Sequence, residues 1–225
     1  MILSVVIPVY NERDTIREIL ARVRAVPIAK EIICVDDCSG DGTTEILLEE
    51  SSAPDIVFLR HQRNMGKGAA VRTGLAAVKG EIVIIQDADL EYDPSDYPRL
   101  LEPILRGETQ VVYGSRFRGR RDEMSLSHNL GNRLVTWVTN ILFGTALTDM
   151  ETCYKVFTSE VAKRIELTSP RWAFDPEITA KVLRMGYTIR EVPISYMGRL
   201  STQGKKIRWQ DGFTVLYTLV KCRFL

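Results

Sequence analysis

Two aspartates, Asp87 and Asp89, follow an apolar run at residues 82–85. In an extended backbone, a spacing of two directs both side chains to the same side. Two carboxylates held together are unfavourable unless a cation or protons compensate them, and Mg²⁺ binds one or two carboxylates together with substrate phosphate oxygens. We therefore predict a Mg²⁺ or Mn²⁺ site on Asp87 and Asp89, extended by Glu91 directly or through water. The alternative, a helix cap near Ser95, is less favoured because an apolar strand precedes the pair.

A second acidic pair, Asp36 and Asp37, ends another apolar run. In dinucleotide-binding folds an acid at this place accepts hydrogen bonds from a ribose hydroxyl or a base edge. The alternative is turn chemistry that feeds a helix at Thr43, and the Asp41–Gly42 dipeptide is typical of a turn. We expect Asp37 to be functional and Asp41 to be structural.

The glycine-rich segment at residues 64–68 precedes a predicted helix, so its backbone amides and Lys67 are expected to face a phosphate group. The segment lacks the Gly-Lys-Ser/Thr order of a Walker A loop. A GxGxxG pattern is also missing after the first strand, which argues against a dinucleotide oxidoreductase. A sugar nucleotidyltransferase is disfavoured as well, since no glycine-rich basic loop follows that strand.

The elements that must position these residues alternate in the first half of the chain, as in parallel βαβ units. Strands are predicted at residues 4–8, 31–35, 56–59, 81–86 and 110–114, and helices at residues 13–26, 43–50, 66–78 and 95–106. Pro103 should bend or end the last helix. Ligands collect at the carboxyl ends of parallel strands, where this sequence places its polar clusters.

The second half has a different pattern, which predicts additions to one α/β domain. A polar, basic loop is expected at residues 116–127, helices at 129–143 and 176–185, and strands at 154–157 and 188–194, before a basic and then apolar tail from residue 199. We expect no separate second domain, because no linker interrupts the chain.

Composition narrows the class of protein. The chain has 225 residues, 45% apolar and 26% charged, with a net charge of +1, so we expect no general attraction to nucleic acid. The four cysteines show no zinc-ligand spacing, and no secretory signal is recognised, so free thiols in a reducing cytoplasm are predicted. No apolar run approaches the roughly 20 residues that cross a bilayer. The protein is expected to be soluble or bound at most to a membrane surface.

Seven segments match an ordered family pattern: VVIPVYNE (5–12), VDDCSGDGT (35–43), RNMGKGAAVRTG (63–74), QDADLEYDP (86–94), YGSRF (113–117), EVPISYMGR (191–199) and GKKIRW (204–209). Together they resemble the family 2 glycosyltransferases, most closely the dolichol-phosphate mannosyltransferase and polyprenyl-phosphate glycosyltransferase branch. The resemblance extends over nearly the whole chain.

The resemblance implies a GT-A fold over residues 1–225, an α/β architecture with a Rossmann-like, mostly parallel sheet flanked by helices and a C-terminal acceptor-side elaboration. Residues 1–115 would bind the nucleotide-sugar and residues 116–225 the acceptor. The implied activity is metal-dependent, inverting transfer of a hexose from a UDP- or GDP-sugar to a polyprenyl or dolichyl phosphate. The alternatives are transfer to a saccharide or other hydroxyl, and a non-catalytic nucleotide-binding module.

The resemblance also assigns site residues by position. Those matched to the nucleotide-sugar are Pro8, Tyr10, Glu12, Val35, Asp37, Asp87, Ala88, Arg116, Arg199 and Lys205. Asp87, Ala88 and Asp89 match the diphosphate and metal site, and Glu91 stands where the mannosyltransferases have glutamine. Arg121 and Ser125 have the four-residue spacing that grips an acceptor phosphate.

A catalytic base is required if the acceptor is a sugar hydroxyl. Asp175 and Glu177 are candidates by position, as are Asp149 and Glu151. The alternative for the first two is helix capping, with Pro176 at the first helical position. A lipid phosphate is already largely ionised near neutral pH and needs no base. Asp89 is catalytic through the predicted metal.

Membrane contact is a hypothesis drawn from the apolar helix around residues 137–143, the basic loop before it and the tail at residues 215–225. An interfacial helix buries such a face in lipid, whereas a helix packed on the sheet is the more common arrangement. We expect a cytoplasmic protein, with peripheral contact at the inner face of the membrane as the hypothesis to be tested.

Overall fold

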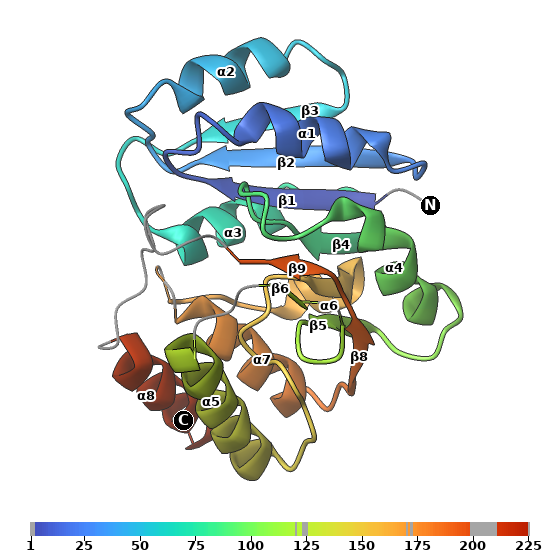
Figure 1. Cartoon of the computed structure of the whole chain (residues 1–225), viewed down its shortest axis with the longest axis vertical. Helices are drawn as coiled ribbons and strands as arrows, with labels where there is room; N and C mark the ends of the chain where they lie inside the picture. The colour runs from blue at the N-terminus through green and yellow to red at the C-terminus, as the bar shows by residue number, and fades with distance from the viewer. Residues whose placement is uncertain are drawn as a thin grey trace.

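A computed structural model describes residues 3–119, 121–122, 126–169, 171, 173–198 and 211–224, with the side chains of residues 121, 122, 126–128 and 211 left out (Figure 1). Its main sheet has the strand order β3-β2-β1-β4-β7-β5-β8. The strands are β1 (Leu3–Val9), β2 (Lys30–Asp36), β3 (Ile56–Arg60), β4 (Ile82–Ile85), β5 (Val111–Ser115), β7 (Lys155–Thr158) and β8 (Ile189–Pro193). A small parallel pair joins β6 (Arg121–Asp122) to β9 (Tyr196–Met197).

The first four strands are parallel, as the sequence predicts. Every residue of β1 and of β4 is buried, because helices cover both faces of a parallel sheet. β2 pairs with β1 and β3, and β4 pairs with the other side of β1. Parallel pairing brings the carboxyl ends of these strands to the same edge of the sheet.

The helices fall into two groups in Figure 1. Those of the first half are α1 (Ile16–Ala25), α2 (Thr43–Glu50), α3 (Lys67–Ala76) and α4 (Tyr97–Leu105), the last preceded by a 3-10 turn at Pro94–Asp96. Those of the second half are α5 (Leu126–Phe143), α6 (Ser159–Arg164), α7 (Phe174–Arg184) and α8 (Asp211–Phe224). A small apolar cluster centred on Val135, Ala180 and Leu219 joins α5, α7 and α8 apart from the main core.

The mostly parallel α/β sheet is confirmed, and several details depart from the expected elements. β7 lies antiparallel between β4 and β5. Pro103 lies inside α4, which ends two residues later at Leu105. The expected loop at residues 116–127 contains β6 and the start of α5, and α6 is an additional helix whose first turn is capped by Thr158. Within the described residues, no helix combines the length and apolarity that crossing a bilayer requires.

Candidate active site

The carboxyl ends of the parallel strands form one edge of the sheet, the strand-end edge. At this edge Pro8 of β1 is paired with Val35 of β2. Both residues are buried in the sheet, so their contribution to a ligand site comes from the loops that follow them. Tyr10, two residues beyond Pro8, is 37% exposed. Of the residues predicted to bind the nucleoside, Pro8 and Val35 therefore form a buried platform, and Tyr10 presents an exposed aromatic ring.

The loop after β1 is braced against the loop after β2. The Asn11 amide donates to Ser39 Oγ (3.0 Å), and the Gly40 amide donates to Asn11 Oδ1 (2.9 Å). Asn11 has a left-handed φ of 53°, a conformation that asparagine tolerates better than most residues. The bracing fixes the backbone between Tyr10 and Glu12.

Asp37 is buried and holds the loop that follows β3. Its carboxylate accepts hydrogen bonds from the Met65 amide (2.8 Å) and the Gly66 amide (2.7 Å), and Oδ1 lies 2.7 Å from His61 Nδ1. These contacts place Lys67 at the start of α3. Asp41 caps the turn before α2, where it accepts from the Thr43 amide (3.0 Å), as the sequence predicts.

Lys67 reaches Asp87 across the site edge, with 2.5 Å between Nζ and Oδ1. Burial opposes both charges, but the carboxylate raises the pKa of Lys67, and the ammonium lowers the pKa of Asp87. The sequence predicts Lys67 for phosphate, and the structure pairs it with the first aspartate of the predicted metal site. A positive charge therefore sits at the place where a diphosphate is expected.

Gly68 explains how α3 approaches the second half of the chain so closely. A Cβ at this position would lie 2.3 Å from the Ser169 carbonyl oxygen and 2.9 Å from the Phe174 Cβ. With no side chain at residue 68, Lys67 Nζ lies 5.5 Å from the centre of the Phe174 ring. The glycine brings the start of α7 alongside the strand-end edge.

Asp89 and Glu91 lie on the turn that follows β4. The Asp89 carboxylate accepts from the Glu91 amide (3.1 Å), and Glu91 Oε2 accepts from the Tyr196 hydroxyl (2.9 Å). The Met197 amide donates to the Glu91 carbonyl oxygen (2.9 Å). The turn is thus docked on β9, which carries the chain toward Arg199.

The residues present fit a hard divalent cation by their chemistry. Asp87, Asp89 and Glu91 are oxygen ligands at the carboxyl edge of a parallel sheet, and Mg²⁺ completes its coordination with water and phosphate oxygens. In the structure these three side chains have separate partners, and among the described residues no three His, Cys, Asp or Glu side chains form a ready metal cluster. A donor diphosphate would have to supply the remaining ligands.

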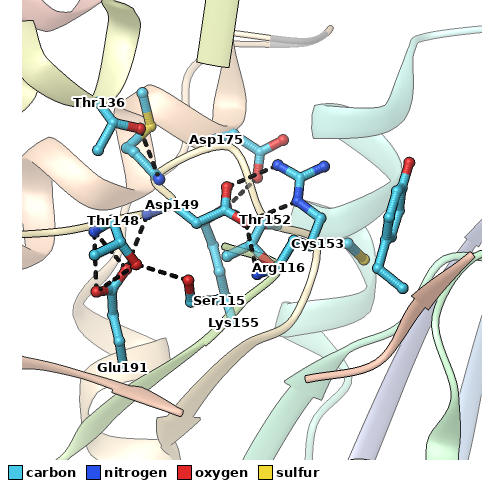
Figure 2. A network of polar contacts seen from close by, with 12 residues as sticks. Ser115, Arg116, Thr136, Thr148, Asp149, Thr152, Cys153, Lys155, Asp175 and Glu191 are labelled. Carbon is cyan, nitrogen blue, oxygen red and sulfur yellow. Dashed lines mark hydrogen bonds and ion pairs between the residues drawn. The ribbon is translucent and has the colours of Figure 1, made fainter. Parts of the chain in front are cut away.

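Arg116 forms a buried ion pair with Asp149 (Figure 2). Its Nε and Nη2 atoms each donate to the carboxylate at 2.7 Å, and its amide donates at 3.0 Å. Glu191 fixes the segment that carries Asp149, because its carboxylate accepts from the Thr148 and Asp149 amides at 2.8 and 2.9 Å. The guanidinium also stacks over Tyr196, with its carbon 5.3 Å from the ring centre. Arg116, predicted for donor phosphate, thus stands beside the ring that binds Glu91.

A second buried pair joins Lys155 to Asp175, 2.5 Å between Nζ and Oδ1 (Figure 2). Nearby, Glu151 Oε1 and Thr152 Oγ1 are buried without a hydrogen-bond partner among the described residues. Burial, and next the negative charge of Asp175, raises the pKa of Glu151 to about 8. The site therefore contains a carboxylic acid that keeps its proton at neutral pH.

Glu177, two residues after Asp175, has different surroundings. It accepts from the Thr168 amide (2.9 Å), the Ser169 amide (2.7 Å) and Lys181 Nζ (2.7 Å). Burial opposes ionisation, but the hydrogen bonds from Lys181 and Thr168 lower the pKa of Glu177 to about 2. These contacts anchor the loop before α7, whereas Asp175 lies in the charged cluster of the site.

Some predicted residues lie outside the described part of the chain. Ser125, Arg199 and Lys205 are among them, and Arg121 is described by its backbone in β6 alone. Ala88 is buried between the two aspartates. Of the predicted set, Asp87, Asp89 and Glu91 follow β4 with separate partners, Arg116 reaches Glu91 through Tyr196, and Asp175 pairs with Lys155.

Comparison with known proteins decides the family. The model of the family described as "Glycosyl transferase family 2" matches residues 4–165. The chain belongs to this family. The matched region of this glycosyltransferase includes Lys67 and both aspartates that follow β4.

Two curated relatives extend over nearly all of this glycosyltransferase. An uncharacterized protein of Methanocaldococcus jannaschii is 30% identical over 223 residues, 96% of this chain and 90% of its own. The undecaprenyl-phosphate 4-deoxy-4-formamido-L-arabinose transferase of Edwardsiella ictaluri is 32% identical over 225 residues, 97% of this chain and 67% of its own.

Solved structures show the same fold. The glucosyl-3-phosphoglycerate synthase of Mycobacterium tuberculosis with phosphoglyceric acid has a TM-score of 0.75 at 23% identity, and covers 98% of this chain and 79% of its own. The same enzyme with Mn²⁺, UDP and phosphoglyceric acid also has a TM-score of 0.75, at 22% identity over 99% and 78% of the two chains. The glycosyltransferase thus has the GT-A fold, and these neighbours bind UDP with a divalent metal.

Sequence reasoning gave no role to Lys155 or to the pairing of Arg116 with Asp149. Lys155 begins an apolar strand and is fully buried. Because lysine is rarely buried without a partner, a lysine in an apolar run was the sequence feature that could have indicated a buried ion pair. Cys153 was also missed. Its thiol donates to the Ile85 carbonyl oxygen (3.8 Å), and burial raises its pKa. Each partner is distant in sequence, which is why spacing could not reveal these pairs.

Proposed function

We propose that this glycosyltransferase moves a hexose, with inversion, from a UDP- or GDP-sugar to a polyprenyl phosphate at the cytoplasmic face of a membrane. The observation that carries the proposal is that Asp87, Asp89 and Glu91 follow β4 at the carboxyl edge of the sheet, where Lys67 pairs with Asp87 and buried Arg116 stacks on the tyrosine that binds Glu91. Carboxylates for a metal and cations for phosphates are the two requirements of a nucleotide-diphosphate leaving group. The undecaprenyl-phosphate transferase relative supports the acceptor class.

In this proposal, residues 1–115 hold the donor. The exposed ring of Tyr10 and the acid Glu12 face the nucleoside from the braced loop, over the platform of Pro8 and Val35. Asp37 contributes by fixing the loop that presents Lys67. A Mg²⁺ or Mn²⁺ ion held by Asp87, Asp89 and Glu91 would neutralise the negative charge that develops on the leaving diphosphate. Arg199 and Lys205 are proposed to add phosphate contacts from the tail.

Residues 116–225 are proposed to hold the acceptor. Lys155 provides buried positive charge near the start of α7, and Arg121 with Ser125 would grip the acceptor phosphate. A phosphate monoester has a second pKa near 6 and is mostly dianionic at neutral pH. Its oxygen is therefore ready to attack the sugar without a base. The protonated Glu151 can donate a hydrogen bond to such an anion.

A hydroxyl acceptor is the second candidate, and the position of Asp175 favours it. This carboxylate is 7% exposed, held by Lys155, and close enough to Lys67 to affect its pKa. It could accept the proton of an attacking hydroxyl. The hydrogen bonds of Glu177 to the loop before α7 support a positioning role for that residue instead.

The test is incubation with radiolabelled UDP- and GDP-hexoses, short-chain polyprenyl phosphates and Mg²⁺ or Mn²⁺, followed by phase extraction. We expect label in the organic phase, with the opposite anomeric configuration from the donor by NMR. Label that moves only to aqueous products would overturn the lipid acceptor and favour the hydroxyl acceptor. Donor binding without turnover on any acceptor would indicate a nucleotide-binding module.

A further inference from the structure

Two neighbouring helices, α5 and α8, each carry a stripe of exposed, large apolar side chains. The side chains are between 46% and 72% exposed, and they are Leu130, Leu134, Trp137 and Ile141 on α5 and Phe213, Tyr217, Val220 and Phe224 on α8. Both stripes have the spacing 0, 4, 7 and 11, which keeps four residues on one side of an α-helix. Single exposed apolar residues are ordinary, whereas two continuous stripes mark an interaction surface.

The stripes lie opposite the sides by which the helices pack. At about 100° per residue, the centre of the α5 stripe is about 150° from the buried Val135 and Thr139, and that of the α8 stripe is about 150° from the buried Val215 and Leu219. The buried sides meet one another and α7 through the small apolar cluster. Figure 1 shows the two helices side by side at the end of the molecule farthest from α2. The protein's own core therefore uses the opposite sides and leaves the stripes outward.

The charges around the stripes have one sign. α5 has no acidic residue, and Asp211, the first residue of α8, is the only acid on the two helices. By helical position, Lys221 and Arg223 flank the α8 stripe on its two sides, and both are exposed. Arg223 donates to the Leu142 carbonyl oxygen (2.8 Å) and stacks near Phe143, so its charge lies where the two helices meet.

We propose that this paired surface, the α5–α8 face, docks on an anionic phospholipid bilayer. The proposal rests on the proposed function, because a polyprenyl phosphate acceptor resides in a membrane. Apolar side chains would enter the headgroup boundary, while the flanking cations contact lipid phosphates. A second copy fits less well, since a two-fold interface would bring the same cations together with Asp211 as the only acid on either helix.

The first test is vesicle flotation of the full chain with zwitterionic vesicles and with vesicles containing 30% anionic phosphatidylglycerol. We expect flotation with the anionic vesicles, and at least tenfold weaker binding for the Trp137→Glu/Tyr217→Glu double variant. Leu48→Glu is the matched control, because Leu48 is a 55% exposed leucine on α2, and it should float like the parent. Lys221→Gln should weaken binding to anionic vesicles about fivefold.

Two outcomes would overturn the docking proposal. The first is failure in flotation: the parent protein stays in the aqueous fraction with both vesicle types, or the double variant floats as well as the parent. The second is a concentration-dependent dimer, seen by mass photometry, that the double variant abolishes while vesicles bind neither protein. That result would assign the face to a second copy.

Activity assays separate this proposal from the proposed function. The double variant should keep the parent's rate on a short, water-soluble polyprenyl phosphate and lose at least tenfold on a long-chain acceptor embedded in anionic vesicles. Equal losses on both acceptors would contradict a docking role. Flotation without transfer to either acceptor would leave the docking surface intact and overturn the proposed function.

Discussion

Two acidic pairs occupy equivalent places in this sheet, and they have different surroundings. Asp36 ends β2 and Asp37 follows it, and Asp87 and Asp89 follow β4 at the same edge. The Asp37 carboxylate accepts hydrogen bonds from two backbone amides and contacts a histidine. Buried Asp36 accepts hydrogen bonds from the Thr44 hydroxyl and the Ser39 amide. Asp87 instead faces the ammonium of Lys67. An acid satisfied by the backbone is part of the scaffold, whereas one balanced by a side-chain cation can exchange that partner for a ligand.

The strongest test of this contrast is the effect of removing charge from the second pair. Asp89→Asn should lower turnover at least 100-fold, about 3 kcal/mol in transition-state free energy, because a neutral amide is a poor ligand for the proposed divalent ion. A chelator should abolish turnover by the parent and Mn²⁺ should restore it. Steady-state rates with radiolabelled donor measure the loss, and the melting temperature should stay close to that of the parent.

If Asp89→Asn turned over at the parental rate, or if the chelator had no effect, the second pair would not be a metal site. The contrast between the two pairs would then concern the fold alone.

The same substitution in the first pair should act on stability. Asp37→Asn weakens the hydrogen bonds that hold Met65 and Gly66, and charge-assisted bonds of this kind contribute about 2 kcal/mol. For a chain of this size we expect a melting temperature lower by about 4–8 °C. Calorimetry measures the shift, and donor titration measures affinity in the same samples. A raised donor KM with unchanged melting would make Asp37 a ligand-binding residue.

The last prediction concerns a third acid, Glu151, and the pH dependence of the protein's stability. Its pKa in the folded protein is about 8, above the ordinary value of 4.5, so the folded state holds a proton that the unfolded chain has released. Stability should therefore fall as pH rises from about 4.5 to 8. Glu151→Gln should flatten that fall and stabilise the protein at pH 8 relative to the parent, measured by urea unfolding at pH 5 and pH 8. Parallel pH profiles for the two proteins would show that Glu151 ionises normally.

The sequence predicted the parallel half of the sheet and the residues that follow its strands. Apolar runs such as residues 82–85 and the acids after them are local signals, and the structure keeps them at one edge. Glu177 was not separable from Asp175 on these grounds, because both are acids in one helical turn. Their difference comes from the segment at Thr168 and Ser169, which folds back onto Glu177 alone.

The second half was less predictable for physical reasons. An apolar run at residues 154–157 predicts a strand, but its direction depends on where α5 returns the chain. The pair formed by Arg116 and Asp149 spans 33 residues, and no periodicity connects them. The stripe on α8 was also hidden, since apolar residues occur on both its buried and its exposed sides.

The central position of β7 has a consequence for synthesis of the chain. Val156 pairs with Ile84 of β4 on one side and with Val112 of β5 on the other. When only the first 115 residues have emerged from the ribosome, β4 therefore has an open, apolar edge. Unpaired borders of this kind join neighbouring chains, so a fragment cut at residue 115 should aggregate, and the nascent protein should depend on chaperones until residue 158 has emerged.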